Sequence, residues 1–179
     1  MLDAAVKLLK RGGASTITTN RIAAAAGVSI GSVYQYFPNK HALFAALHER
    51  HIHHVDEIVQ RKMMESAEAS LDDVVNSWID AMVEAHVTDP ELAELLQSEV
   101  PHRTGGTLDF STRLHRRFRE ALAPHQRSFG RKIDLDTAAF IVANLVESLG
   151  HAVVLRRPRG LSLVRAKQES CRAIQAYLS

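Results

Sequence analysis

The chain has 179 residues, a formal net charge of +2 and 46% apolar residues, which is typical of a soluble globular protein of one or two small domains. This composition excludes collagen-like, low-complexity and broadly disordered chains. The single cysteine, Cys171, allows no intrachain disulfide and no cysteine-based zinc site, and it favours a reducing, cytoplasmic compartment. We expect no membrane span, since no apolar run approaches roughly 18 residues. We also expect no secretory signal, because the first residues lack a basic segment before an apolar core.

In chain order, the first half of the sequence predicts four helices, with no convincing strand alternation. They are expected at about residues 2–11, 20–26, 30–37 and 40–64. Glycines end the first two, at Gly12-Gly13 and Gly27. Thr19 and Ser29 are the expected N-caps of the second and third helices.

The second half predicts five more helices, which makes an all-α fold of about nine. They are expected to begin after Ser70, at Pro90, near Phe110, after Asp136 and after Ser162. A loop is expected over residues 102–107. The helix that follows Asp136 is apolar almost all round up to Arg156, so it needs partners on both of its faces.

The charge is unevenly distributed along these elements. Residues 1–47 carry five lysine or arginine side chains and one carboxylate, Asp3, which gives them a net charge of +4 and leaves −2 for the remainder. No carboxylate lies between Ala4 and His48. Such a stretch fits a polyanionic partner, because nucleic-acid affinity comes largely from phosphate neutralisation. A solvated basic face is the simpler alternative, and charge alone does not decide between the two.

Residues 19–43, TNRIAAAAGVSIGSVYQYFPNKHAL, are the most informative stretch. Two short helices joined by Ala-Gly-Val-Ser have the layout of a helix-turn-helix. The alanines allow the helices to cross closely, and Gly27 provides the positive φ of the turn. Val28 is expected to be an apolar plug between the helices, and Val33 and Phe37 are expected to lie in the core.

This stretch strongly resembles the TetR family of bacterial transcription regulators. The residues that carry the resemblance are Thr19, Ile22, Ala23, Ala26, Gly27, Val28, Ser29, Gly31, Val33, Tyr34, Tyr36, Phe37, Lys40 and Leu43. The resemblance is sharp over residues 1–47 and beyond them rests on helix number and length. It implies an N-terminal helix-turn-helix DNA-binding domain of three helices at residues 1–47. A C-terminal helical ligand-binding and dimerisation domain would follow at residues 48–179.

The exposed start of the third helix is the expected reader of DNA. Short side chains there would let the backbone approach the floor of the major groove, and Gln35 can pair with a base edge, best with adenine. Ile30 can touch a thymine methyl group, and by resemblance Asn20 reaches a base. Phosphate contacts are expected from polar side chains around this helix. The full expected set is Thr18, Thr19, Asn20, Ser29, Ile30, Gly31, Ser32, Tyr34, Gln35, Tyr36 and Lys40.

The resemblance also implies a small-molecule pocket in the C-terminal domain. Effector binding would shift the long fourth helix, move the two recognition helices of a dimer apart and release DNA. The candidate pocket residues are Trp78, Met82, His86, Phe110, Leu114, Phe118, Asn144 and Glu147, which would suit a largely apolar effector. Core packing is the alternative role for each apolar one of these, and for Glu147 the alternative is an arginine of a second subunit.

The two last helices are the expected dimer interface. They would form a four-helix arrangement with a second copy, in which Gly150 and the alanines permit close approach. The candidate interface residues are Leu145, Leu149, Val153, Val164, Cys171 and Ile174. A fully buried helix within a monomer is the alternative.

The remaining motifs do not point to an enzyme. The sequence has no HExxH, no GxSxG and no phosphate-binding glycine loop. The histidines at 48, 51, 53 and 54 come without a cysteine or an evident carboxylate ligand, so we expect no metal and no cofactor.

The sequence therefore predicts a cytoplasmic, homodimeric, ligand-responsive repressor of a palindromic DNA operator. An interaction module for an acidic partner is the main alternative, and DNA sequence specificity separates the two.

Overall fold

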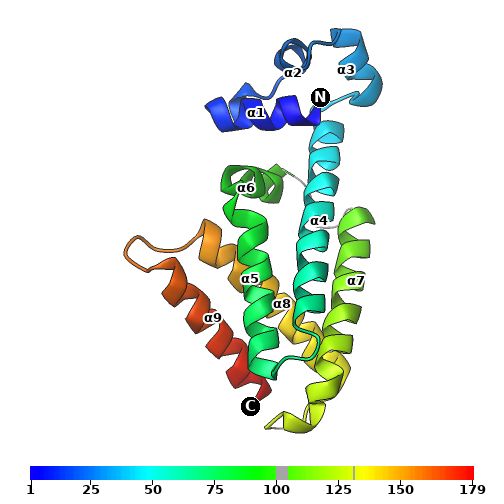
Figure 1. Ribbon diagram of the computed structural model, residues 1–179. Coiled ribbons are helices and arrows are strands. Elements are labelled where there is room, and N and C mark those ends of the chain that lie inside the picture. The colour runs from blue at the N-terminus through cyan, green and yellow to red at the C-terminus, as the bar shows by residue number, and fades with distance from the viewer. Residues whose placement is uncertain (100–104, 131) are drawn as a thin grey trace. The chain divides into compact units, whose positions relative to one another are not determined.

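The computed structural model describes residues 1–99, 105–130 and 132–179 of the chain (Figure 1). Within these ranges the chain forms nine α-helices and two short 3₁₀ segments and no strand, which confirms the all-α prediction. Its contacts divide it into two compact units. The first comprises Met1–His53 and Asp89–Thr107, and the second comprises His54–Thr88 and Leu108–Ser179. The long helix α4 (Lys40–Glu65) contributes to both units.

The first unit packs α1, α2, α3, the start of α4 and α6 around a small apolar core. The helices are α1 (Leu2–Gly12), α2 (Thr19–Ala26), α3 (Ile30–Tyr36) and α6 (Pro90–Glu99). α1 packs against α2 and α6, and α2 packs against α3. Apolar residues at helical spacing supply the core, which includes Leu9, Ile22, Val33, Phe44 and Leu96. Arg50 donates to Asp3 across this unit at 2.5 Å.

The second unit is a helical bundle built on α5, α7, α8 and α9 with the second half of α4. These helices are α5 (Leu71–Val87), α7 (Gly105–Leu122), α8 (Leu135–Leu155) and α9 (Leu163–Leu178). α5, α8 and α9 pack against one another. Trp78 and Phe118 lie in their core with ring centroids 4.4 Å apart. Gly150 of α8 is buried where that helix approaches Met82 of α5, so its lack of a side chain serves packing within one subunit.

The helix boundaries agree with the predicted stops and differ at two caps. Ser29, Ser70 and Ser162 cap their helices as predicted. Thr18 caps α2 in place of Thr19, because Thr18 has the extended backbone that lets its Oγ1 accept from the N–H of Arg21 at 3.3 Å.

The start of α8 is the second difference. Asp134 caps this helix in place of Asp136, and its Oδ1 accepts from the N–H of Thr137 at 2.9 Å. Hydrogen bonds from the side chain and the N–H of Thr137 lower the pKa of the Asp134 carboxyl. Asp136 instead accepts from Nε of Arg119 on α7 at 2.6 Å.

Three further predictions need correction. Residues 105–107, expected in a loop, begin α7, while residues 102–104 of that loop lie outside the described ranges. Val28 is 38% exposed, so it is no plug between helices. We expected no apolar run near the length of a membrane span, but α8 (Leu135–Leu155) is long and apolar enough by length and composition alone. This helix is apolar on most sides because it packs against both α5 and α9.

Candidate nucleic-acid interface

The turn between α2 and α3 is fixed by backbone hydrogen bonds around one glycine. Gly27 has φ 68° and ψ 31°, which confirms the predicted left-handed conformation. Its N–H is directed at the last carbonyls of α2, and the N–H of Val28 donates to the carbonyl of Ala23 at 3.1 Å. This pattern is a Schellman motif. It ends α2 at Ala26, and α3 begins only a few residues later, at Ile30 (Figure 1).

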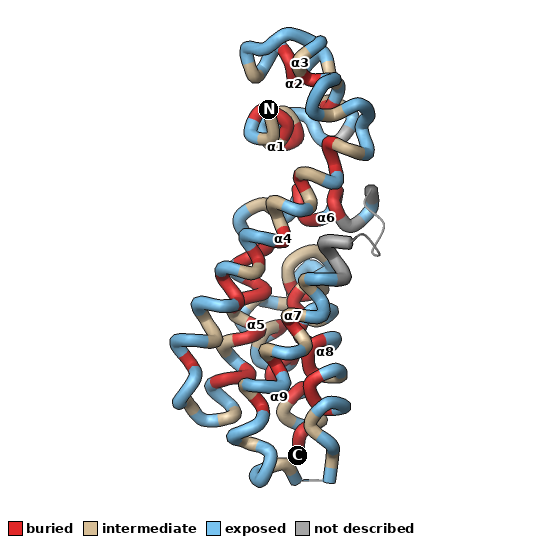
Figure 2. Tube along the Cα trace, turned by 90° about the vertical axis from the view of Figure 1, so that its right-hand side faces the viewer, coloured by how far each residue is buried: buried red, intermediate tan, exposed pale blue. Residues whose placement is uncertain are grey.

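One face of α3 packs against the core of the first unit, and the opposite face is exposed to solvent. Val33 is fully buried against α2, and Phe37 packs at the edge of the same core. The Oγ of Ser29 accepts from the N–H of Ser32 at 3.0 Å, which fixes the start of the helix. The opposite face is exposed (Figure 2). On it Ile30, Tyr34 and Tyr36 are 47%, 50% and 68% exposed, although large apolar and aromatic side chains are usually buried.

The structure places most of the predicted DNA contacts at the surface of this helix pair. Nine of them are exposed: Thr18, Asn20, Ser29, Ile30, Gly31, Tyr34, Gln35, Tyr36 and Lys40. Thr19 and Ser32 are half-buried. The oxygen atoms of Thr18 and Ser29 accept capping hydrogen bonds, and the hydroxyls of Ser29 and Ser32 are hydrogen-bonded to each other at 2.9 Å. The hydroxyl proton of Thr18 is the group that remains to offer a phosphate.

Two exposed cationic side chains, Lys40 and Arg21, belong to the helices that follow and precede α3. Lys40 begins α4, and its Nζ lies 4.9 Å from the ring centroid of Phe44. Asn39 accepts from the N–H of Ala42 at 2.8 Å and so caps the same helix. Arg21 is exposed on α2 and was not among the predicted contacts, although the excess of positive charge in this stretch pointed to it. Lys10, by contrast, forms an ion pair with Asp89.

The structure places the predicted pocket residues in two different environments. Met82, His86, Leu114 and Phe118 are buried in the core of the second unit, and Phe110 packs against that core. Asn144 and Glu147 are exposed on α8. The burial of the apolar ones agrees with the core-packing alternative, because apolar residues at helical spacing pack against neighbouring helices. Their role in a ligand pocket stays a prediction.

His86 is buried and pairs with the half-buried His151. Its Nδ1 lies 2.7 Å from the carbonyl of Met82, and its Nε2 lies 2.9 Å from Nε2 of His151. A carbonyl only accepts, so neutral His86 carries its proton on Nδ1 and its Nε2 accepts from the Nε2–H of His151. Burial lowers the pKa of His86. Among the described residues, no group of three or more potential ligands could hold a metal ion.

A cavity of about 360 Å³ opens elsewhere in the second unit, between the end of α4, the start of α5 and the end of α7. Of the eight predicted pocket residues, Trp78 is the one that lines it. Its other lining residues are Gln60, Met63, Met64, Ser66, Ala67, Val74, Arg117, Glu120, Ala121 and Pro124. No periodic pattern of residues indicated this cavity, because helix ends and small residues such as Ser66, Ala67 and Ala121 contribute to its lining.

The predicted interface residues separate into two groups. Val153, Cys171 and Ile174 are buried in the core of their own subunit, which removes them from any contact with a second one. Leu145 and Leu149 are half-buried, and Val164 is 64% exposed. Phe140 of α8, which sequence reasoning placed in a helix apolar all round, is 55% exposed.

A capped helix pair with this turn and this exposed face has the layout of a helix-turn-helix unit, the class of fold that binds DNA. Residues 1–47 match the family model for bacterial regulatory proteins of the tetR family. Residues 70–178 match the model for the tetracyclin repressor-like C-terminal domain. The second match alone covers more than half of the chain. The chain therefore belongs to the TetR family.

Individual relatives agree with this assignment. The HTH-type transcriptional repressor SCO4008 of Streptomyces coelicolor is 30% identical over 112 residues, which are 57% of this chain and 53% of that protein. The chain thus spans about half the length of the curated relative that it matches.

Solved structures share the fold at low sequence identity. A protein of unknown function from Rhodococcus sp. RHA1 is 18% identical, with a TM-score of 0.75 over 99% of this chain and 92% of that chain. The regulator FadR of Bacillus subtilis, solved with stearoyl-CoA, is 18% identical, with a TM-score of 0.72 over 99% and 97% of the two chains. The multidrug binding protein EbrR, solved with imidazole, is 16% identical, with a TM-score of 0.65 over 99% and 92%.

Proposed function

We propose that the protein is a cytoplasmic, homodimeric repressor that binds a two-fold symmetric DNA operator and releases it when a small molecule binds the second unit. The observation that carries this proposal is the exposed face of α3. Ile30, Tyr34 and Tyr36 leave a large apolar and aromatic surface in water. DNA would cover this surface, with base edges opposite the start of the helix and phosphates opposite the tyrosines.

The side chains of α3 suit close approach to a groove. A Cβ added at Gly31 would meet only the Oγ of Ser29, at the ordinary contact distance of 3.7 Å. The fold therefore does not require glycine there, and the open space above residue 31 is available to a base pair. Gln35, one turn further along and exposed, offers both a donor and an acceptor to a base edge.

Dimerisation would use the exposed surfaces of α8 and α9. Phe140 on α8 and Val164 on α9 are large apolar residues that are exposed to water. Leu145 and Leu149, further along α8, are half-buried. A second copy that covers them would bring four helices together around a two-fold axis. Two recognition helices would then read two half-sites about one turn of DNA, roughly 34 Å, apart.

Release would pass through α4, because this helix is common to both units. Its first residues help to form the core beneath α3, through Leu43, Phe44 and Leu47. Its last turns line the cavity, through Gln60, Met63 and Met64. A ligand that binds more tightly when α4 is in one of two positions shifts the equilibrium toward that position. The size of the shift is set by the ratio of the two affinities.

Two experiments test the proposal. Footprinting on the DNA upstream of the protein's own gene is expected to protect a two-fold symmetric site, and protection of an asymmetric site or of none would contradict the symmetric operator. Val164→Glu is expected to give a monomer in analytical ultracentrifugation and to weaken operator binding. Val87→Glu is the matched control, since Val87 is 50% exposed on α5. Equal dimerisation of both variants would contradict the α8–α9 interface.

A further inference from the structure

His86 of α5 and His151 of α8 bring two imidazole nitrogens together inside the second unit. Their Nε2 atoms are 2.9 Å apart, and the ring planes are nearly perpendicular, at 82°. The ring centroids are 4.4 Å apart. An end-to-end N–H···N bond would separate the centroids by about 5 Å, because each lies about 1.1 Å behind its nitrogen. The two rings therefore meet at an angle and do not lie along one line.

Two neighbouring ligands of one metal ion meet in this way. Imidazole nitrogens bind divalent transition metals at about 2.0–2.1 Å. Two such nitrogens at a right angle around one ion are about 2.9–3.0 Å apart, whereas at the tetrahedral angle they are about 3.3–3.4 Å apart. The observed separation of 2.9 Å fits the right angle. The pair therefore suits octahedral or square-planar ions such as Ni²⁺ and Cu²⁺ better than tetrahedral Zn²⁺.

The ring of His86 already has the tautomer and the orientation of a metal ligand. Its Nδ1–H donates to the carbonyl of Met82 at 2.7 Å, so its Nε2 carries a lone pair. Metal-binding histidines almost always donate their other N–H in this way, which fixes the ring. Burial lowers the pKa of His86, so the ring is neutral, as a ligand must be. An ion would replace the Nε2 proton of His151, and neutral His151 would then carry a proton on Nδ1.

The pair depends on the close approach of α5 and α8. Gly150 immediately precedes His151, and a Cβ added there would lie 2.5 Å from the Cβ of Met82. Met82 is also the residue whose carbonyl holds His86. The lack of a side chain at residue 150 therefore lets the backbone of α8 come near enough to α5 for His151 to reach His86.

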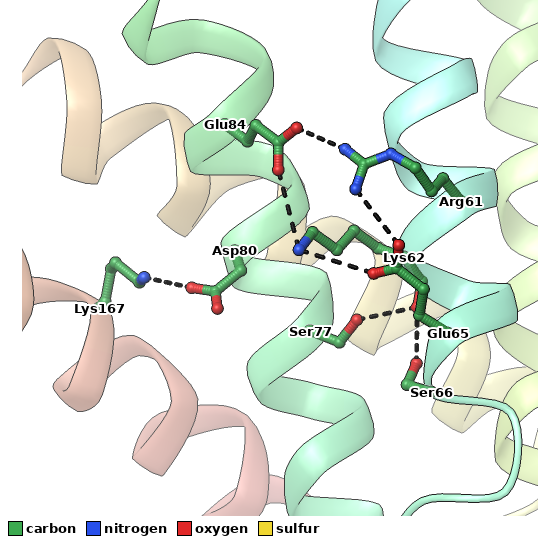
Figure 3. A network of polar contacts seen from close by, with 8 residues as sticks. All are labelled: Arg61, Lys62, Glu65, Ser66, Ser77, Asp80, Glu84 and Lys167. Atoms are coloured by element: carbon green, nitrogen blue, oxygen red, sulfur yellow. Dashed lines mark hydrogen bonds and ion pairs between the residues drawn. The ribbon is translucent and has the colours of Figure 1, made fainter.

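Polar contacts hold α5 on its other sides (Figure 3). Glu84 pairs with Arg61 of α4, and its second carboxylate oxygen lies 3.8 Å from Nζ of Lys62. Asp80 pairs with Lys167 of α9. α5 is thus fastened to α4 and to α9, and α8 packs against it. A ligand on a helix held in this way needs little reorganisation to bind an ion.

We infer that His86 and His151 form a binding site for one divalent transition-metal ion of the kind that prefers imidazole ligands. Two histidines leave the remaining coordination positions to water, and His151 is half-buried, so an ion reaches the pair from solvent. Such a site is open, unlike a structural zinc site with four protein ligands. It departs from the expectation of no metal, which rested on the histidines at 48–54. Local spacing does not indicate the pair, because its members are 65 residues apart.

Calorimetric titration of the untagged full chain, after dialysis against a chelator, tests the inference with Ni²⁺, Cu²⁺, Zn²⁺ and Mg²⁺. We expect Cu²⁺ and Ni²⁺ to bind more tightly than Zn²⁺. Mg²⁺, which prefers oxygen ligands, should bind at least about 100-fold more weakly than Ni²⁺. Failure of both Ni²⁺ and Cu²⁺ to bind would overturn the inference, as would Mg²⁺ binding as tightly as they do. Zn²⁺ binding more tightly than Ni²⁺ would overturn the right-angle geometry.

Three variants locate the ion. His151→Gln is expected to weaken Ni²⁺ binding at least about tenfold, because loss of an outer partner of a ligand alone costs about 10- to 100-fold. His125→Gln is the matched control, since His125 is another half-buried histidine of the second unit. His51→Gln breaks the i, i+3 spacing of the histidines on α4 and should leave the affinity unchanged. Affinity lost in His51→Gln and retained in His151→Gln would place the ion on α4 and overturn the inference.

Two further readouts do not require the loss of a ligand. Ring ¹⁵N NMR of the natural chain with diamagnetic Zn²⁺ should show His151 change from the Nε2–H to the Nδ1–H tautomer while His86 keeps its proton on Nδ1. An unchanged His151 tautomer at saturating Zn²⁺ would overturn the site. Gly150→Ala keeps both histidines but moves α8 away from α5, so it should also weaken Ni²⁺ binding. Unchanged affinity in this variant would contradict the dependence of the pair on helix approach.

Discussion

Gly150→Ala tests how closely α5 and α8 approach within one subunit. A Cβ at residue 150 would lie 2.5 Å from the Cβ of Met82 and 3.2 Å from its Cγ. The first distance is about 1 Å shorter than an ordinary carbon–carbon contact. Rotation of the Met82 side chain cannot relieve it, because Cβ is fixed to the backbone. The two helices would have to move apart in a closely packed core.

Two opposing effects decide the magnitude. Overpacking costs about 1–3 kcal/mol, and this contact lies at the upper end, about 2–3 kcal/mol, because neither Cβ can rotate away. Alanine in place of glycine inside a helix contributes about 1 kcal/mol of stability. We expect a net loss of about 1–2 kcal/mol, which lowers the Tm by roughly 2–8 °C for a chain of this size.

Urea and thermal unfolding followed by circular dichroism measure this loss. Gly31→Ala is the control, because its Cβ would meet only a hydroxyl at 3.7 Å and its stability should be unchanged or slightly raised. Met82→Gly in the Gly150→Ala background removes the clashing Cβ, so the two changes should couple favourably. Gly150→Ala as stable as the natural chain would refute the close approach of α5 and α8.

Three further predictions concern charge and ionisation. Burial lowers the pKa of His86, so the unfolded chain takes up a proton first, and stability should fall as the pH drops below about 6.5, by at most about 1.4 kcal/mol per pH unit from this group. Unfolding of His86→Gln at several pH values should lack this contribution, and an identical pH dependence would contradict the buried neutral state. Burial, and to a lesser extent Asp80, raise the pKa of the Cys171 thiol to about 11, so iodoacetamide at pH 8 should label it in urea and leave it unlabelled in the folded chain. Lys40→Gln should reduce the slope of log Kd against log salt by about 1 for operator and scrambled DNA alike, if Lys40 contacts a phosphate; an unchanged slope would remove it from the interface.

The sequence was sufficient for the local architecture of the DNA-binding helices. Gly27 and the following serine specify the turn chemically, since one residue must adopt positive φ and the next must cap a helix. The errors at the caps of α2 and α8 arose where two capable residues lie close together. Which of them caps depends on which backbone is extended at that point, and composition does not determine this.

Periodicity was much less informative about the second unit. It identified Cys171 and Ile174 as facing a partner, but the partner that covers them is α5 or α8 of the same chain and not a second subunit. Helical spacing alone does not distinguish packing within one subunit from packing between two subunits, because both bury the same apolar face of the helix. The cavity could not be predicted for a related reason. Small residues such as Ala67 and Ala121 line it, and small residues do not mark a helix face with a periodic pattern.

The measurement that tests the account most directly is the affinity of the Gln35→Ala variant for the protected operator and for a scrambled duplex, by fluorescence anisotropy. Gln35 is exposed on α3, and Gln126→Ala provides the same substitution at an exposed position of the second unit. We expect the natural chain and Gln126→Ala to prefer the operator equally. Gln35→Ala should lose about 1–3 kcal/mol of that preference while its binding to scrambled DNA is unchanged. Equal discrimination by all three proteins would contradict base reading by α3.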